Sequence, residues 1–167
     1  MTVPAPRPLL PRETLIGVVR HTPLVSIDLI LRDGRGEVLL GWRRNRPAQA
    51  SWFVPGGRIL KDERVAEALR RIAQAELGLT ADEVAAARPA GVFEHLYPDN
   101  FADEPGIGTH YVVLAYEARV DRDSVRALDA QHRELRWFPV EALVADPQVH
   151  ENTRAYFDPA ITSTRTP

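Results

Sequence analysis

A single glutamate, Glu76, falls where the sequence predicts the apolar face of a helix. On a helical wheel of residues 63–79, at about 100° per residue, polar side chains gather on one arc and apolar side chains cover a wide opposite face. Glu76 lies inside that apolar face, between Leu69 and Ile72. A buried carboxylate without a counter-charge is strongly destabilising, so Glu76 must meet a cation. The helix alone leaves two interpretations open: a structural ion pair, for instance with Arg71, or a metal site.

The residues before and after Glu76 follow a spacing that narrows this choice. The stretch resembles the Nudix box, G-x5-E-x7-R-E-U-x-E-E-x-G-U, and the positions that match it are Gly57, Glu63, Arg71, Glu76, Gly78 and Leu79. Nudix enzymes use the acids of this box to bind divalent metal ions against a diphosphate. The resemblance therefore favours the metal site over the structural ion pair.

Two positions of the box depart from the pattern, because Ile72 and Ala75 stand where ordinary members carry acids. One carboxylate then remains on the metal face, so a single ion is expected instead of several. The same departure is found in the GDP-mannose mannosyl hydrolase family, which the chain also resembles outside the box. The similar segments are residues 22–26, 45–49, 52–58, 61–63, 75–79, 99–101, 109–114, 131–132 and 154–157.

This second resemblance implies an activity, a cofactor and a set of site residues. It implies hydrolysis of GDP-mannose, and also of GDP-glucose, to GDP and free sugar with one Mg²⁺ per site, for which Mn²⁺ can substitute. The implied metal ligands are the Gly57 carbonyl, Glu76 and Gln131, all oxygen donors of the kind that Mg²⁺ prefers. His132 would be the general base. The residues implied around the sugar and the diphosphate are Arg43, Arg58, Arg71, Tyr111, Asp28 and His95.

Cleavage at the anomeric carbon suits such a set of residues. Attack by water passes through an oxocarbenium-like state, with negative charge growing on the leaving oxygen. GDP is a good leaving group when a metal ion and arginines take up that charge, so no carboxylic acid is needed to protonate it. A histidine can remove a proton from water near neutral pH. Displacement from the face opposite the diphosphate predicts inversion of configuration.

Other interpretations remain open at this stage. A conventional Nudix pyrophosphohydrolase would cleave at phosphorus, and a nucleotide-sugar binding module would not cleave at all. Taken one by one, His132 can be a solvated loop residue, Arg43 a surface charge paired with Asp28, and Tyr111 a core residue.

The elements that must position these residues are an alternating set of strands and helices. Residues 24–31 and 38–44 alternate in polarity around the turn residues 33–36, which predicts a hairpin. Residues 52–57 indicate a short strand that ends in a tight glycine turn, and a helix follows from Asp62 or Glu63 to Gly78. Further strands are predicted at 91–97, 110–120 and 134–138, and short helices at 140–145 and 151–157. The expected class is α/β, a Nudix fold with a mixed β-sheet sandwiched between α-helices.

The composition limits what else the chain can be. Its 167 residues contain no cysteine, which excludes disulfides and thiol chemistry. A net charge of −2 argues against a general nucleic-acid binder, and no apolar run reaches transmembrane length, so we expect a cytoplasmic enzyme that acts on a small nucleotide sugar. The family resemblance implies a homodimer. The predicted organisation is an extended N-terminal arm over residues 1–12, a Nudix hydrolase domain over 13–158 and a flexible tail over 159–167.

Overall fold

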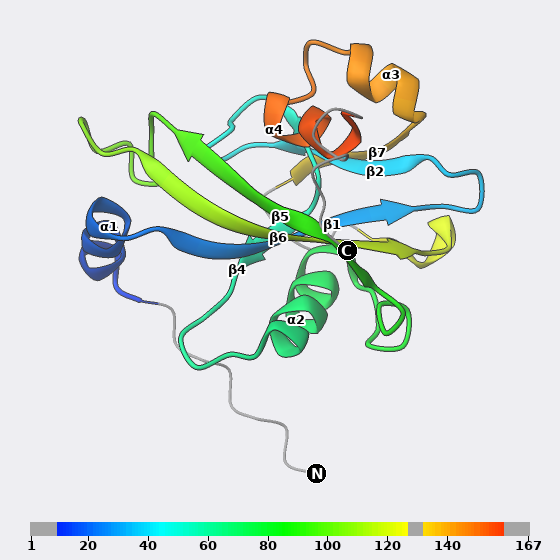
Figure 1. The fold of residues 1–167 in the computed structure, drawn as a ribbon, viewed down its shortest axis with the longest axis horizontal. Coiled ribbons are helices and arrows are strands. Elements are labelled where there is room, and N and C mark those ends of the chain that lie inside the picture. Colours follow the sequence, from blue (N-terminus) through cyan, green and yellow to red (C-terminus); the bar gives the residue numbers. More distant parts are fainter. Residues whose placement is uncertain (1–9, 127–131, 159–167) are drawn as a thin grey trace.

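A computed structural model describes residues 10–126 and 132–158 of the chain, with the side chains of residues 132 and 133 excepted. Figure 1 shows a sheet with α2 on one side and the C-terminal helices on the other. The elements in chain order are α1 (Arg12–His21), β1 (Leu24–Arg32), β2 (Val38–Arg43), β3 (Trp52–Phe53), β4 (Gly56–Arg58), α2 (Val65–Leu77), β5 (Arg88–Tyr97), β6 (Thr109–Arg119), η1 (Arg122–Ser124), β7 (His132–Phe138), α3 (Val140–Ala145), α4 (Glu151–Arg154) and η2 (Ala155–Phe157). The predicted α/β sandwich is confirmed.

The sheet is mixed, and its longest parallel pairing joins distant parts of the chain. The strand order is β3-β2-β1-β6-β5, with β4 paired to β1 and β7 paired to β2 off this path. β1 runs parallel to β6 from Leu24 opposite Tyr111 to Arg32 opposite Arg119. β5 is antiparallel to β6 and places His95 opposite Tyr111. The sheet thereby brings Asp28, His95 and Tyr111 onto neighbouring strands.

The predicted hairpin forms only at its turn. β1 and β2 pair at Arg32 and Val38, and the side chain of Asp33 accepts hydrogen bonds from the amides of Arg35 and Glu37. Beyond that point the strands separate. β4 takes the place beside β1, with Ile27 opposite Gly57, and β2 pairs with β7 and β3 instead. Local alternation could not reveal this, because the strand that separates the pair comes later in the chain.

Apolar side chains cover both faces of β1 and fill two cores. Ile27, Leu29 and Leu31 pack against α2, as their spacing predicts. Ile30, on the opposite face, belongs to the core that includes Tyr156 of η2. This double burial fixes the register of β1, because a slip of one residue would exchange its two faces.

Helix α2 begins slightly later than the sequence indicates and ends where it was expected. Asp62 has a left-handed backbone with φ of 64°, which no α-helix accommodates, so the first turn starts at Val65. The Glu67 carboxylate accepts the free amide of Arg64 at 3.0 Å. At the other end, Gly78 has φ of 66° and closes the helix.

One element was not predicted. Helix α1 packs against β1 and β6 through a small apolar cluster that includes Val19, Leu24 and Ile107. The segment has few apolar residues and Gly17 interrupts them, so their helical periodicity is weak. No helix in the described ranges is long and apolar enough to cross a membrane.

Candidate functional site

A cavity of about 520 Å³ opens above β1, β2, β4 and β5, a size that suits a small organic ligand. Four of its lining residues are cationic: Arg43, Arg44, Arg46 and Arg58. Asp28, His95 and Tyr111 line the same cavity. The structure therefore brings together five residues that the sequence singled out: Asp28, Arg43, Arg58, His95 and Tyr111. Clustered arginines beside one carboxylate suit a ligand with an anionic part and a hydroxyl-rich part.

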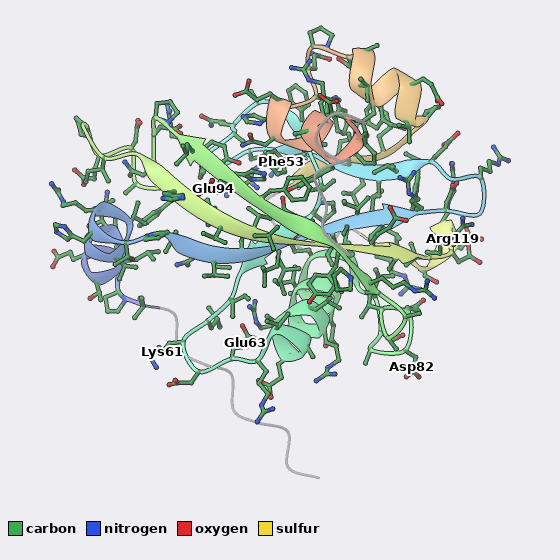
Figure 2. The ribbon with its side chains drawn as sticks, in the orientation of Figure 1. Phe53, Lys61, Glu63, Asp82, Glu94 and Arg119 are labelled. Carbon is green, nitrogen blue, oxygen red and sulfur yellow. The ribbon has the colours of Figure 1, made fainter. Side chains whose placement is uncertain are left out.

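Arg43 is placed to bind an anion. Its guanidinium carbon lies 5.5 Å from the centre of the Phe53 ring, a face contact that steadies the side chain. Phe53 itself lies between the sheet and the C-terminal helices (Figure 2). Among the described residues, the buried Nε of Arg43 has no hydrogen-bond acceptor. A buried donor without an acceptor is destabilising, and a ligand oxygen in the cavity would satisfy it.

The floor of the cavity contains a buried acid with a tyrosine partner. Asp28 is 6% exposed, and its Oδ2 accepts a hydrogen bond from the Tyr156 hydroxyl at 2.5 Å. Burial raises the pKa of Asp28 to about 6, against the opposing effects of the Tyr156 hydrogen bond and the charge of Arg43. Asp28 is thus an anionic acceptor at neutral pH.

Two other cavity residues are held in their neutral forms. Burial lowers the pKa of His95 to about 4, and a second histidine, His150, acts in the same direction. Burial also raises the pKa of Tyr111 above its usual range, while Arg58 and Arg43 oppose that shift. At neutral pH His95 is an uncharged imidazole and Tyr111 carries its proton, so Tyr111 can donate to a ligand oxygen.

The paired glycines of the box do not form the predicted turn, and that expectation was wrong. Gly56 and Gly57 lie within β4, whose backbone passes close to β1. A Cβ on Gly56 would lie 2.5 Å from Asp28 Oδ1 and 2.6 Å from the carbonyl oxygen of Ile27. Gly56 permits the close approach of β4 to β1, since no side chain fits between it and Asp28.

Glu76 is buried on the apolar face of α2, as its position on the wheel predicts. It is 5% exposed, and its Oε2 accepts the amide of Gly56 at 3.1 Å. A Cβ on Gly57 would lie 3.7 Å from Glu76 Oε1 and 3.2 Å from Ile72 Cγ1. Glu76 and Gly57 are therefore neighbours, and Ile72 fills the space at a position where an ordinary box has an acid.

The donors present fit a small hard cation. The Glu76 carboxylate and the backbone carbonyl of neighbouring Gly57 are oxygen ligands of the type that Mg²⁺ favours, and Mg²⁺ takes its remaining ligands from water and substrate phosphates. Within the described residues, no three acidic or histidine side chains form a metal cluster. The third predicted ligand, Gln131, lies outside the described residues.

Arg71 has a different position from the other predicted arginines. Its Nε and Nη2 donate to the two oxygens of Glu63 at 2.6 and 2.8 Å, and Nη2 also donates to the Arg58 carbonyl at 2.8 Å. Glu63 lies beside α2 at the end of the preceding loop (Figure 2). Neither Arg71 nor Glu76 is among the cavity-lining residues in the described part of the chain. Arg71 instead joins Glu63 to the end of β4 at Arg58.

The predicted base is located only through its backbone. His132 opens β7 and is paired with Arg43 of β2, at a register shift that follows Gly41. Its strand therefore runs beside the arginine-bearing strand of the cavity. The side chain of His132 lies outside the described part of the structure.

Sequence reasoning did not assign a role to several residues at the site. Arg46 binds Asp99 at 2.7 Å and so ties the β2–β3 loop to the β5–β6 loop at the cavity. Tyr156 comes from η2, far from Asp28 in sequence. The cluster of arginines at 43, 44 and 46 was a usable sequence signal for Arg46. The role of Tyr156 is revealed only by the fold.

Comparisons with known proteins agree with this geometry. A model of the NUDIX domain matches residues 22–159. The low-salt glycan biosynthesis protein Agl8 of Haloferax volcanii is 40% identical over 141 residues, which are 83% of this chain and 86% of that protein. An RNA pyrophosphohydrolase of Teredinibacter turnerae is 41% identical over 59 residues, which are 35% of this chain and 33% of that protein.

Solved structures share the fold. A MutT protein from Methanosarcina mazei superposes with a TM-score of 0.66 at 22% identity, covering 82% of this chain and 92% of that chain. A MutT NUDIX hydrolase from Burkholderia pseudomallei superposes with a TM-score of 0.65 at 27% identity, covering 81% of this chain and 96% of that chain. The box residues, the sandwich and the family match agree: the chain belongs to the NUDIX domain family of hydrolases.

Proposed function

We propose that the protein hydrolyses a GDP-sugar, GDP-mannose or GDP-glucose, to GDP and free sugar by attack of water at the anomeric carbon. One observation carries the proposal: Glu76 is a buried acid beside Gly57, while Ile72 packs at a box position that ordinary members fill with an acid. Enzymes that attack phosphorus gather several carboxylates and metal ions at this place. A box that keeps Glu76 as its one acid on this face of α2, with Glu63 paired to Arg71, favours charge neutralisation of a leaving diphosphate over activation of water at phosphorus.

The cavity residues support separate binding of the two ends of the substrate, the diphosphate and the sugar. Arg43 and Arg58 would bind the diphosphate, and Tyr111 would donate to the same oxygens. Asp28 would accept from sugar hydroxyls, because an anionic carboxylate repels phosphate and attracts hydroxyl donors. The guanine preference and the choice between mannose and glucose follow from the family resemblance.

The metal would be held by the Gly57 carbonyl, Glu76 and the Gln131 side chain. When bound, Mg²⁺ would supply positive charge for the diphosphate oxygens as GDP leaves the sugar. The protein residues do the rest. Arg43 and Arg58 orient the phosphates, Arg71 holds the end of β4 at Arg58, and His132 takes the proton of the attacking water.

A relative supports a sugar-containing substrate. The Haloferax volcanii protein, 40% identical over most of both chains, is named for glycan biosynthesis. A second candidate is conventional pyrophosphohydrolysis at phosphorus, which the retained Gly57, Glu63 and Arg71 and the shorter match to an RNA pyrophosphohydrolase favour. It would release GMP and sugar phosphate.

Hydrolysis of GDP-mannose in ¹⁸O-labelled water with Mg²⁺ distinguishes the two. We expect the label in free mannose with GDP as co-product, and β-mannose as the first anomer detected by NMR. Label in a phosphate group would establish cleavage at phosphorus and end the proposal. Binding of GDP-mannose without turnover would identify a binding module instead. Activity measured on a panel of nucleotide sugars then shows which nucleobase and which sugar the enzyme prefers.

A further inference from the structure

Three buried polar side chains from distant parts of the chain form a hydrogen-bonded row beneath the cavity. Asp28 of β1, His95 of β5 and Tyr156 of η2 are 6%, 4% and 3% exposed. The Tyr156 hydroxyl lies 2.5 Å from Asp28 Oδ2 and 3.2 Å from His95 Nε2. On the far side of the imidazole, His95 Nδ1 lies 3.5 Å from the Tyr97 hydroxyl.

The donors and acceptors of this row allow one arrangement when Asp28 is ionised. A carboxylate only accepts, so the single Tyr156 proton points to Asp28. The Tyr156 oxygen can then only accept from His95, which places the imidazole proton on Nε2. His95 Nδ1 is left as an acceptor that faces Tyr97. Both ring nitrogens of His95 are therefore directed at tyrosines.

Packing does not explain the Tyr156 hydroxyl. The ring of Tyr156 lies in an apolar core, with its centre 4.6 Å from that of Phe93 in an edge-to-face contact. A phenylalanine would make that contact equally well. Burying a hydroxyl destabilises the fold unless it is hydrogen-bonded, so the oxygen at this position must serve the groups that it touches.

We propose that Tyr156 is a positioning residue, which holds the Asp28 carboxylate with one oxygen bound below and the other available to substrate, and which sets the tautomer of His95. The other oxygen, Oδ1, lies beside Gly56, itself a lining residue of the cavity. The ligand group that this fixed acceptor selects is a neutral hydroxyl. Its assignment to the sugar of the substrate rests on the proposed function.

Two measurements on Tyr156→Phe test the positioning role, and the first needs no substrate. In ¹⁵N-histidine-labelled protein we expect His95 to show one tautomer, protonated at Nε2, and to become a mixture of tautomers in the variant. A spectrum of His95→Asn assigns the resonances. Tyr116→Phe is the matched control, since Tyr116 is a partly buried tyrosine on the other core of the sheet.

The second measurement separates positioning from stability through kinetics. Loss of one hydrogen bond to a charged group should raise KM for the nucleotide sugar about tenfold while kcat changes less than about threefold. In Asp28→Asn the further effect of Tyr156→Phe should largely disappear, because the two residues act as a unit. Tyr116→Phe should change neither constant.

The outcomes are distinct. An unchanged His95 tautomer in Tyr156→Phe overturns the inference, whatever happens to the melting temperature, because a purely structural tyrosine would leave the imidazole as it was. A shifted tautomer with unchanged KM also overturns it, since positioning would then have no effect on the ligand. A shifted tautomer in a protein that does not turn over GDP-sugars, but binds them more weakly in the variant, upholds the role of Tyr156 and rejects the proposed reaction.

Discussion

A methyl group on Gly56 is the smallest change that should disturb the site. Gly56→Ala would place Cβ against Asp28 Oδ1 and the Ile27 carbonyl, at 2.5 and 2.6 Å, and the backbone atom cannot move without shifting β1. Overpacking of this kind costs about 1–3 kcal/mol, so we expect a lower melting temperature and weaker ligand binding. Thermal unfolding followed by circular dichroism measures the first.

Gly34 offers a matched control for that substitution. A Cβ on Gly34 would meet nothing within 4 Å, so Gly34→Ala should unfold close to the wild-type temperature. If the two variants melted alike, the tight approach of β4 to β1 would have no bearing on stability.

The charge of Glu76 can be removed while its shape is kept. Glu76→Gln retains an acceptor for the Gly56 amide but loses the anion, so roughly tenfold more Mg²⁺ should be needed for half-maximal activity. Activity titrations with Mg²⁺ and Mn²⁺ measure this, with Glu141→Gln on the exposed side of α3 as control. An unchanged metal titration would exclude Glu76 as a ligand.

His132 should affect turnover more than binding. His132→Gln keeps a polar side chain but removes the proposed base, and kcat should fall by about 10² or more with little change in KM. Steady-state kinetics on GDP-mannose measures both constants, and the exposed His21 gives the control variant His21→Gln. Near-normal turnover would remove His132 from the reaction.

At the scale of elements, one arginine of α2, Arg71, joins Glu63 to the end of β4. Arg71 bridges the two oxygens of Glu63 and the Arg58 carbonyl, a geometry that a lysine cannot reproduce. Arg71→Lys should therefore lower kcat/KM about tenfold, while the free energy of unfolding falls by no more than about 1 kcal/mol for a partly exposed pair. Arg70→Lys, exposed on the same helix, should be neutral.

Most elements were predictable, because their signals are local. β5, β6, β7, α3 and the pair α4 and η2 lie within a few residues of the predicted segments. The end of α2 follows from Gly78, and its delayed start follows from the backbone of Asp62, which the sequence does not display. The predicted glycine turn was wrong for a related reason: Gly56 faces β1 and Gly57 faces α2, and both close approaches depend on tertiary structure.

At the scale of the whole molecule, the site is a product of long-range pairing. Asp28, Arg43, Arg58, His95 and Tyr111 could be named from the sequence through the family resemblance, but their common cavity requires the parallel pairing of β1 with β6. Tyr156 is a residue whose role at the site could not be predicted from the sequence. A tyrosine near the C-terminal end of the described chain looks like a core residue until the structure places its hydroxyl on Asp28.

The buried pair Asp28 and His95 makes stability depend on pH in two opposing ways. Burial raises the pKa of Asp28 from 3.8 to about 6, so its contribution to stability is present below pH 3.8 and is lost as pH rises through 6. Burial lowers the pKa of His95 from 6.5 to about 4, so its contribution is present above pH 6.5 and is lost as pH falls through 4. Between about pH 4 and pH 6, the loss of stability from Asp28 with rising pH therefore opposes the gain from His95.

Single substitutions should separate the effects of Asp28 and His95 on the pH dependence of stability. Asp28→Asn should become more stable relative to wild type as pH rises from 4 to 6, by on the order of 2 kcal/mol, because the lost acid was the destabilising ion. His95→Asn should show the reverse trend. Chemical denaturation at several pH values measures both, and parallel curves for wild type and Asp28→Asn would contradict the assigned shift.

The residues of the cavity floor lie far apart in the sequence, and this separation has a consequence for synthesis of the chain. Asp28 is made early, yet its tyrosine partner lies at position 156. A nascent polypeptide that has emerged only as far as β6 contains the arginines and Asp28 but not the hydroxyl that binds the Asp28 carboxylate. The pocket is therefore complete only once Tyr156 has been added to the chain, and a polypeptide released before that codon would lack the hydroxyl that binds Asp28.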